Sequence, residues 1–317
     1  MSKIVGIGAN VFDTLINVPS YPAEDTKMRS GGIMPCGGGP CATGLVAAAK
    51  LGADCAYIGN LADDTGGRFL KADMERYGVS TEYAAIFEGK NSFSSYILIN
   101  GQNASRTCVF DKGDLPPLIL NSAQKAAVKD ADILMVDGND LDAAVEAAKI
   151  ARENGTRVLY DAGGLYDGVE RLLPYADILI PSEEFALGHT GAKNAEDAAK
   201  KLSEMYSPDV VVITQGKNGG ILLADGNLQR YPSFSVKAVD TNGAGDVFHG
   251  AFAFGVAKRL DYFKCCVFSS AVSALKCTGV GARQSVPDLH TVQKFLKESG
   301  YDEFEKEFRT NFFRCLY

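Results

Sequence analysis

The sequence of 317 residues contains no tryptophan and only three histidines, and its eight cysteines form no Cys-x-x-Cys pair. Zinc sites usually need closely spaced Cys and His ligands, so this distribution argues against one. Cysteines without such spacing are typical of buried or half-buried thiols in a reducing compartment. We therefore expect a cytoplasmic protein.

Long apolar runs are also missing. No run approaches the roughly 18 apolar residues of a membrane span, and the first residues, MSKIVGIGANVFD, lack a cationic segment followed by an apolar one. We expect neither a signal peptide nor contact with a membrane. With 32 Lys and Arg against 39 Asp and Glu, the formal net charge is −7. This balance argues against nucleic acid as the main partner but leaves room for a small anionic ligand in a local pocket.

Short apolar runs alternate along the chain with longer helical patterns. The runs are rich in aliphatic residues and end in Gly, Asp or Ser, as buried parallel strands do. They lie at residues 3–8, 55–59, 132–138, 157–163, 177–184 and 210–216. The helical patterns lie at residues 42–52, 65–78, 141–155 and 194–206. This alternation predicts an α/β fold with a Rossmann-like, doubly wound sheet flanked by helices, whose ligand lies beyond the carboxyl ends of the strands.

Two segments break the alternation. Residues 10–19 and 91–113 are rich in β-forming side chains and predict antiparallel strands, and Asn100-Gly101 indicates a hairpin turn in the second. We expect them to form a small sheet that acts as a lid or a dimer surface. The predicted lid is residues 10–35 and 91–113, and the predicted core is residues 1–9, 36–90 and 114–317. Exposed strand edges on such a lid favour a homodimer that pairs them.

Residues 240–246, DTNGAGD, stand directly before an apolar helical run. Gly243, Ala244 and Gly245 have almost no side chains, so their backbone N–H groups can face a ligand. At the start of a helix these groups lack partners and carry the positive end of the helix dipole, which suits a phosphate. Asp246 at the same turn can orient a hydroxyl group and accept its proton. The alternative is an ordinary loop with Asp246 as a helix cap.

Four segments, in the same order along the chain, resemble signatures of the ribokinase-like (PfkB) carbohydrate kinases. DTNGAGD resembles the C-terminal signature and CGGGPCATGLVAAAKLG (36–52) the N-terminal one. GNLADDTGGRFLKADMERYGV (59–79) resembles the block that follows, and GVGARQSVPD (279–288) resembles a late segment of the family. The resemblance implies a kinase that transfers the γ-phosphate of MgATP to a hydroxymethyl group of a sugar or an acidic sugar derivative.

The resemblance also implies roles for individual residues. Asp246 matches the family's catalytic base, and Gly243, Ala244 and Gly245 match its anion hole. Asp13 matches the carboxylate that holds substrate hydroxyl groups, although it could equally be an ordinary strand-end residue. The remaining matches are the sugar-facing turn Gly38-Gly39, the nucleotide-phosphate element Thr214 and Gly216, and the potassium or other monovalent-cation site Asp240, Asn242 and Ser285. Asp240 could instead simply hold its turn.

The sequence departs from the family pattern in three places. Thr43 stands where the family often has Asn, and Asp161-Ala-Gly-Gly replaces a D-x-N pattern. In the N-x-x-E element linked to magnesium, Ser182 and Phe185 replace the Asn and the Glu. We expect Glu183 or its neighbour to take over through water. These differences suit a carbohydrate kinase of less common specificity better than a ribokinase proper.

Arg106 lies on a predicted lid strand. It is our candidate for binding a phosphate or another acidic group of the substrate, and an exposed strand residue is the alternative. Two other functions stay open. The first is a nucleoside kinase of the same superfamily, in which Phe12, Phe93 or Tyr96 stacks on the base. The second is a non-catalytic regulator that binds a sugar or a nucleotide.

Overall fold

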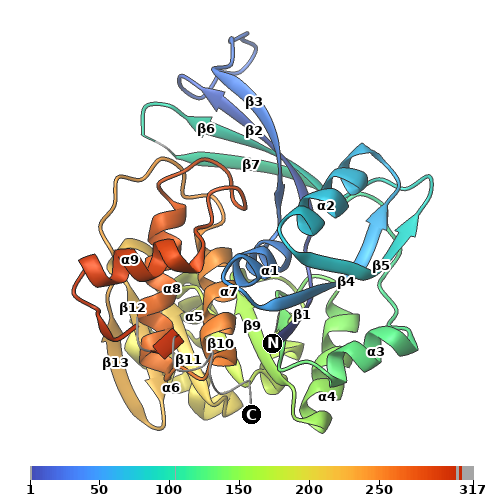
Figure 1. Ribbon diagram of the computed structural model, residues 1–317. Helices are drawn as coiled ribbons and strands as arrows, with labels where there is room; N and C mark the ends of the chain where they lie inside the picture. The colour runs from blue at the N-terminus through green and yellow to red at the C-terminus, as the bar shows by residue number, and fades with distance from the viewer. Residues whose placement is uncertain (1, 104, 305–306, 309–317) are drawn as a thin grey trace.

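The computed structural model describes residues 2–103, 105–304 and 307–308. Its main feature is a sheet with the strand order β13-β12-β11-β10-β9-β8-β1-β4-β5 (Figure 1). The strands of this sheet are β1 (Lys3–Ile7), β4 (Asp54–Ala62), β5 (Val79–Phe87), β8 (Ile133–Val136), β9 (Arg157–Ala162), β10 (Ile178–Pro181), β11 (Val210–Thr214), β12 (Gly220–Ala224) and β13 (Asn227–Tyr231).

The six predicted strands are confirmed as neighbouring parallel strands of this sheet. β1 pairs in parallel with both β4 and β8, and the chain runs outward from there in opposite directions. This is the switch point of a doubly wound sheet, where ligands bind beyond the carboxyl ends of the strands. β12 and β13 form an antiparallel edge that the sequence did not predict.

Helices cover both faces of the sheet (Figure 1). Two separate apolar clusters, one on each face, hold them there. One face carries α1 (Pro40–Lys50), α2 (Thr65–Arg76), α7 (Ala244–Ala257), α8 (Tyr262–Lys276) and α9 (Leu289–Glu298). The other face carries α3 (Ser122–Lys129), α4 (Leu141–Asn154), α5 (Glu183–Thr190) and α6 (Ala195–Tyr206). In the part of the chain that the structure describes, no helix is long and apolar enough to cross a membrane.

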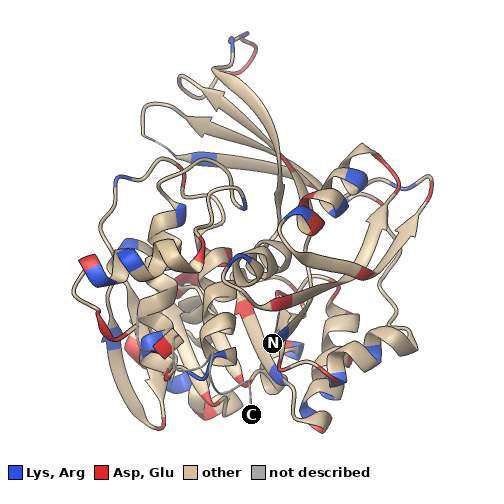
Figure 2. Ribbon diagram, in the orientation of Figure 1, with Lys and Arg blue, Asp and Glu red and all other residues tan. Residues whose placement is uncertain are grey.

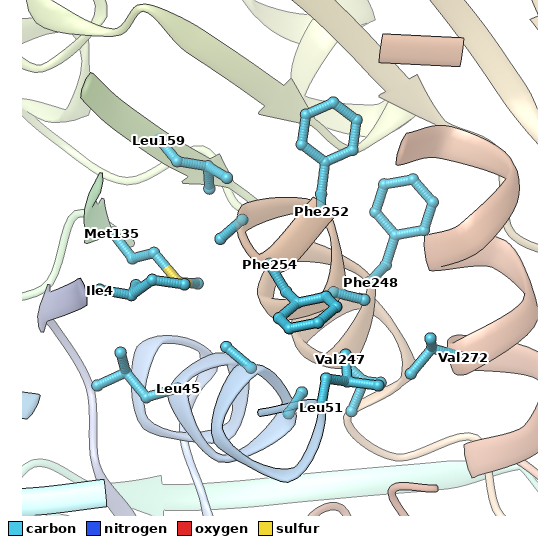
Figure 3. Packing of buried hydrophobic residues seen from close by; sticks show 14 of the residues in the cluster. Ile4, Leu45, Leu51, Met135, Leu159, Val247, Phe248, Phe252, Phe254 and Val272 are labelled. Atoms are coloured by element: carbon cyan, nitrogen blue, oxygen red, sulfur yellow. The ribbon is translucent and has the colours of Figure 1, made fainter. Parts of the chain in front are cut away.

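The packing of α1 against α7 positions the start of α7. Figure 3 shows Leu45 of α1 and Val247 and Phe252 of α7 among the side chains that fill the space next to the sheet. A Cβ atom on Gly250 would collide with the carbonyl oxygen of Gly44, so the two helices can cross this closely only with glycine there. The first turn of α7 is therefore anchored to a buried helix.

The second sheet has the strand order β3-β2-β6-β7, with β2 (Val11–Val18), β3 (Gly32–Gly38), β6 (Ser94–Asn100) and β7 (Arg106–Asp111). The predicted hairpin is the antiparallel pair β6–β7, and residue 104 of its turn lies outside the described residues. β2 is antiparallel to β3 but parallel to β6, so the prediction of antiparallel strands is wrong for that pair. The physical reason is topological, because β2 and β6 follow β1 and β5, which run in the same direction through the main sheet.

We call this second sheet the lid sheet. Strand β3 still pairs with β2 at Gly37 and Gly38. The lid sheet thus extends past residue 36, where the sequence placed the start of the core. The exact division into core and lid remains a prediction.

Candidate active site

The segment before α7 makes a tight turn that exposes backbone donors. Gly243 has a φ of 75°, a left-handed conformation that favours glycine, and a Cβ atom on Gly245 would meet only open space. Ala244 donates its N–H to Thr241 at 3.2 Å. No described residue accepts a hydrogen bond from the N–H groups of Gly243, Gly245 or Asp246. These donors are available to an anion at a positive helix end.

Asp246 lies in the first turn of α7, directly after the donors of Gly243 and Gly245 in the chain. Burial is the main reason that the pKa of Asp246 is raised to about 7; the nearby Asp161, Asp137 and Asp13 carboxylates contribute to this rise, and His249 opposes it. A carboxylate with a pKa near neutrality is well matched to take up a proton during catalysis.

His249, one turn after Gly245, fastens the start of α7 to the sheet. Its Nδ1 is 2.7 Å from the carbonyl oxygen of Gly245 and 3.2 Å from a carboxylate oxygen of Asp161. Its Nε2 is 3.0 Å from the carbonyl oxygen of Ile180 at the end of β10. His249 therefore fixes the first turn of α7, which carries Asp246, against the sheet.

Asp13 of β2 lies at the junction of the lid sheet and the core. Its side chain is buried, the Ser95 hydroxyl donates to it at 2.5 Å, and burial raises its pKa to about 6. A Cβ atom on Gly38 would collide with the Asp13 carboxylate, and Gly39 has a φ of 90° at the N-cap of α1. The Gly38-Gly39 turn is thus needed to seat this carboxylate.

Arg283 is a site residue that the sequence reasoning missed. Its guanidinium is fully buried and lies 2.9 Å from Asp73 of α2 and 2.8 Å from the side-chain oxygen of Asn10. It also donates to the carbonyl oxygen of Gly38 at 2.5 Å. A Cβ atom on Gly37 would collide with it. Arg283 therefore ties the C-terminal loop to the lid junction. The sequence signal for this contact is Gly37, because a side chain there would collide with the guanidinium.

A cavity of about 550 Å³ opens beside the free N–H groups. It is bounded by the end of β11, by residues 233–238 and by α7 and α8. Its lining includes the predicted Thr214 and Gly216 together with Gly245. The C-terminal half of α8 and the residue after it contribute Ser270, Ser273, Ala274 and Cys277. The loop at 233–238 was not predicted. The volume of the cavity and the adjacent backbone N–H groups fit a nucleoside triphosphate.

The profile of the family described as pfkB family carbohydrate kinase matches residues 1–289. The chain belongs to this family. The family resemblance found in the sequence is thereby confirmed, and the protein is a carbohydrate kinase and hence a phosphotransferase.

Relatives and solved structures agree with this assignment to the pfkB family. The chain is 26% identical to the ribokinase of Haemophilus influenzae over 308 residues, covering 92% of this chain and 98% of the relative. It is 27% identical to the ATP-dependent ribose-1-phosphate kinase of Halopiger xanaduensis over 310 residues, covering 94% and 99%. The structure of Arabidopsis thaliana ribokinase complexed with ribose and ATP superposes with a TM-score of 0.83 at 22% identity, covering 93% of this chain and 98% of that one.

The magnesium element of this pfkB kinase departs from the family pattern in the structure as well. Phe185, at the position of the family's Glu, is fully buried and packs against His189, so it cannot face the site. Glu183 accepts a hydrogen bond from Gln215 at 2.7 Å, between Thr214 and Gly216. Glu183 is thus held next to the segment whose Thr214 and Gly216 line the cavity.

Arg106 of this pfkB kinase reaches from the lid sheet to the anion site. Its Nη1 is 3.3 Å from the Thr241 hydroxyl, in the turn before α7. Register pairs Arg106 with Ile99 of β6, which places it on the same face of the lid sheet as Ser95 and Asp13. Its side chain is a cation on the face that looks toward the site.

Proposed function

We propose that the protein transfers the γ-phosphate of MgATP to a hydroxymethyl group of a sugar, with Asp246 as the base. Asp246 accepts the hydroxyl proton as the sugar oxygen forms a bond to the γ-phosphorus. The bond between that phosphorus and the β–γ bridging oxygen breaks, and ADP leaves. Magnesium, when bound, neutralises charge on the phosphates. The N–H groups of Gly243 and Gly245 would stabilise the charge that develops on the transferred group.

The observation that carries this proposal is the meeting of three features at the start of α7. Asp246 has a raised pKa, the N–H groups of Gly243 and Gly245 have no hydrogen-bond partner among the described residues, and Gly245 lines a nucleotide-sized cavity. A non-catalytic regulator would have little need for a base beside the anion site. Phosphate transfer uses all three features.

The Asp13 carboxylate supports a sugar as the acceptor. Its buried position beside a glycine turn suits two hydroxyl groups of a sugar ring, because charge-assisted hydrogen bonds are short and directional. The nucleoside alternative is less well supported, since Tyr96 lies on the lid face opposite Asp13 and Phe12 packs edge-on against Phe69. The relatives named above act on ribose or on a ribose phosphate according to their names.

Arg106 supports an acceptor that carries a second, acidic group. An exposed guanidinium on the site-facing side of the lid, next to Thr241, would pair with a phosphate or carboxylate. We infer that sugar phosphates and sugar acids are the acceptors to examine beside neutral sugars.

The test is ADP release from MgATP with a panel of neutral sugars, sugar acids, sugar phosphates and nucleosides. Turnover with one of the sugar classes is the expected result. Turnover with nucleosides alone would favour the nucleoside kinase. Thermal shifts with the same panel add a binding measurement, and binding without turnover of any compound would favour the regulator.

A further inference from the structure

Lys276, the last residue of α8, is a fully buried cation next to the turn before α7. Its side chain has 0% exposure. Its Nζ donates to the carbonyl oxygen of Asp240 at 2.9 Å and lies 4.0 Å from the Asp240 carboxylate. Lysine is almost never fully buried unless its charge is paired, so this position asks for a structural or functional reason.

The Asp240 and Ser285 side chains, two of the three expected at a monovalent-cation site, already have hydrogen-bond partners within the chain. The two carboxylate oxygens of Asp240 accept the N–H groups of Asn242 and Gly281, each at 2.8 Å. The Ser285 hydroxyl donates to the carbonyl oxygen of Gly281 at 2.6 Å. The Asp240 carbonyl oxygen accepts from the Lys276 ammonium group at 2.9 Å. The donor set does not fit a potassium ion, because the ion would meet an ammonium group at Asp240.

The Lys276 ammonium is well placed to act on the anion site. It holds Asp240, the first residue of the DTNGAGD segment, and Ser273, one turn earlier on α8, donates to the carbonyl oxygen of Ala244 at 2.8 Å. One helix thus braces both ends of the turn that carries the free N–H groups.

We propose that Lys276 replaces the monovalent cation of this kinase site and supplies its positive charge from the chain itself. The enzyme then needs no potassium to order the segment 240–246. The inference rests on the proposed kinase function where it is tested by turnover. The melting temperatures test it independently of that function.

The test compares chloride salts of potassium, sodium and tetramethylammonium at one ionic strength. For the wild type we expect the same turnover and the same melting temperature in all three salts. Lys276→Ala opens room for an ion beside Asp240. We expect it to melt at a lower temperature and to turn over at least tenfold more slowly, and we expect potassium, but not tetramethylammonium, to restore part of both.

Lys50→Ala is the matched control. Lys50 is a half-buried lysine that donates to the carbonyl oxygen of Gln284 at 3.3 Å. Gln284 lies in the C-terminal loop that also carries Gly281 and Ser285. We expect no potassium-specific rescue of this variant. Lys276→Met keeps most of the side-chain volume without the charge and without room for an ion, so it should lose turnover without rescue.

Three results would overturn the inference. The first is a wild type whose turnover or melting temperature rises specifically with potassium. The second is a Lys276→Ala or Lys276→Met variant with wild-type turnover in tetramethylammonium. The third is equal rescue of Lys50→Ala and Lys276→Ala by potassium. If Lys276→Ala does not fold, the wild-type salt series and Lys276→Met still decide the matter. Absence of turnover by the wild type in every salt would reject the kinase function instead, and the melting temperatures would still report on the cation.

Discussion

At the scale of single residues, the raised pKa values of Asp246 and Asp13 set the expected response to pH. Both carboxylates must be ionised to work, and burial raises their pKa values to about 7 and about 6. We expect kcat/KM for the sugar to fall as the pH drops below about 7, and more steeply below about 6, because this ratio reports ionisations of the free enzyme. A pH profile that stays flat through this acid range would contradict the assignment of the base.

The raised pKa of Asp246 also predicts how the stability of the fold changes with pH. The shift that suits catalysis makes the fold less stable near neutral pH. Above its ordinary pKa the unfolded chain releases the Asp246 proton that the folded protein still holds, so this group makes the fold less stable as the pH rises toward about 7. Asp246→Asn should therefore be more stable than the wild type at neutral pH, and the difference should shrink in acid. Denaturant unfolding at several pH values measures it, and a difference independent of pH would count against a raised pKa.

Arg283 is the residue on which the lid junction depends most. Replacing it with Met removes the partner of the buried Asp73 and two hydrogen bonds, to Asn10 and Gly38. We expect the free energy of unfolding to fall by about 3–5 kcal/mol, which is the usual cost of leaving one member of a buried ion pair without its partner. Arg68→Met, which removes an exposed ion pair with Asp63 and a hydrogen bond to its carbonyl oxygen, should cost about 1 kcal/mol or less. Equal losses in the two variants would show that Arg283 does not hold the junction.

At the scale of elements, the sequence predicted the strands whose composition decides their structure. The six buried parallel strands are continuous aliphatic runs, and only such runs can be covered by helices on both faces. The sequence analysis missed four strands, β3, β5, β12 and β13, and for β3 and β13 the physical reason is plain. β3 contains Pro35 and three glycines and resembles a loop, and β13 is a polar edge strand that only its pairing with β12 defines.

The candidate site was predictable where a short segment carries its own chemistry. DTNGAGD holds the glycine turn, the helix start and Asp246 within seven residues. Arg283, Lys276 and the 233–238 loop were missed because their roles depend on partners far away in the chain, as the contact of Arg283 with Asp73 shows. Nothing local distinguishes a lysine or arginine that will be buried.

The lid sheet makes its own prediction through Arg106. If this side chain pairs with an acidic group of the substrate, Arg106→Gln should raise KM by about tenfold or more, because a hydrogen bond to a charged group contributes about 1.5 kcal/mol or more. The effect should be absent for a neutral sugar analogue. Lys112→Gln, which removes a cation just beyond the end of β7, serves as the control. Equal effects of Arg106→Gln on acidic and neutral substrates would contradict the role.

At the scale of the whole molecule, acidic and basic residues are interspersed over the outer helices (Figure 2), whereas the lid sheet presents an apolar surface. Ile33, Tyr96 and Val109 are 65%, 56% and 66% exposed. Register places them on one face, since Tyr96 pairs with Val109 while Ile33 and Tyr96 pair with alternate residues of β2. We propose that this face is covered by a second copy of the chain.

This proposal predicts a homodimer whose stability depends on the lid face. Val109→Asp should shift the protein to monomers by placing a charge in the apolar patch, whereas Val280→Asp, at an exposed valine outside the lid, should leave the mass unchanged. Light scattering during gel filtration measures both. A wild type that is monomeric at every concentration would contradict the proposal.

The most direct measurement of the central claim is the turnover of Asp246→Asn beside the wild type, with MgATP and the best acceptor. Asparagine has the same shape but cannot accept the proton, so we expect kcat to fall by about 10²- to 10⁴-fold. Thermal shifts should show that both proteins still bind ATP and the sugar. Asp288→Asn, at a helix cap away from the site, should keep the wild-type rate. An Asp246→Asn variant with near-normal kcat would show that Asp246 is not the base and would contradict the account.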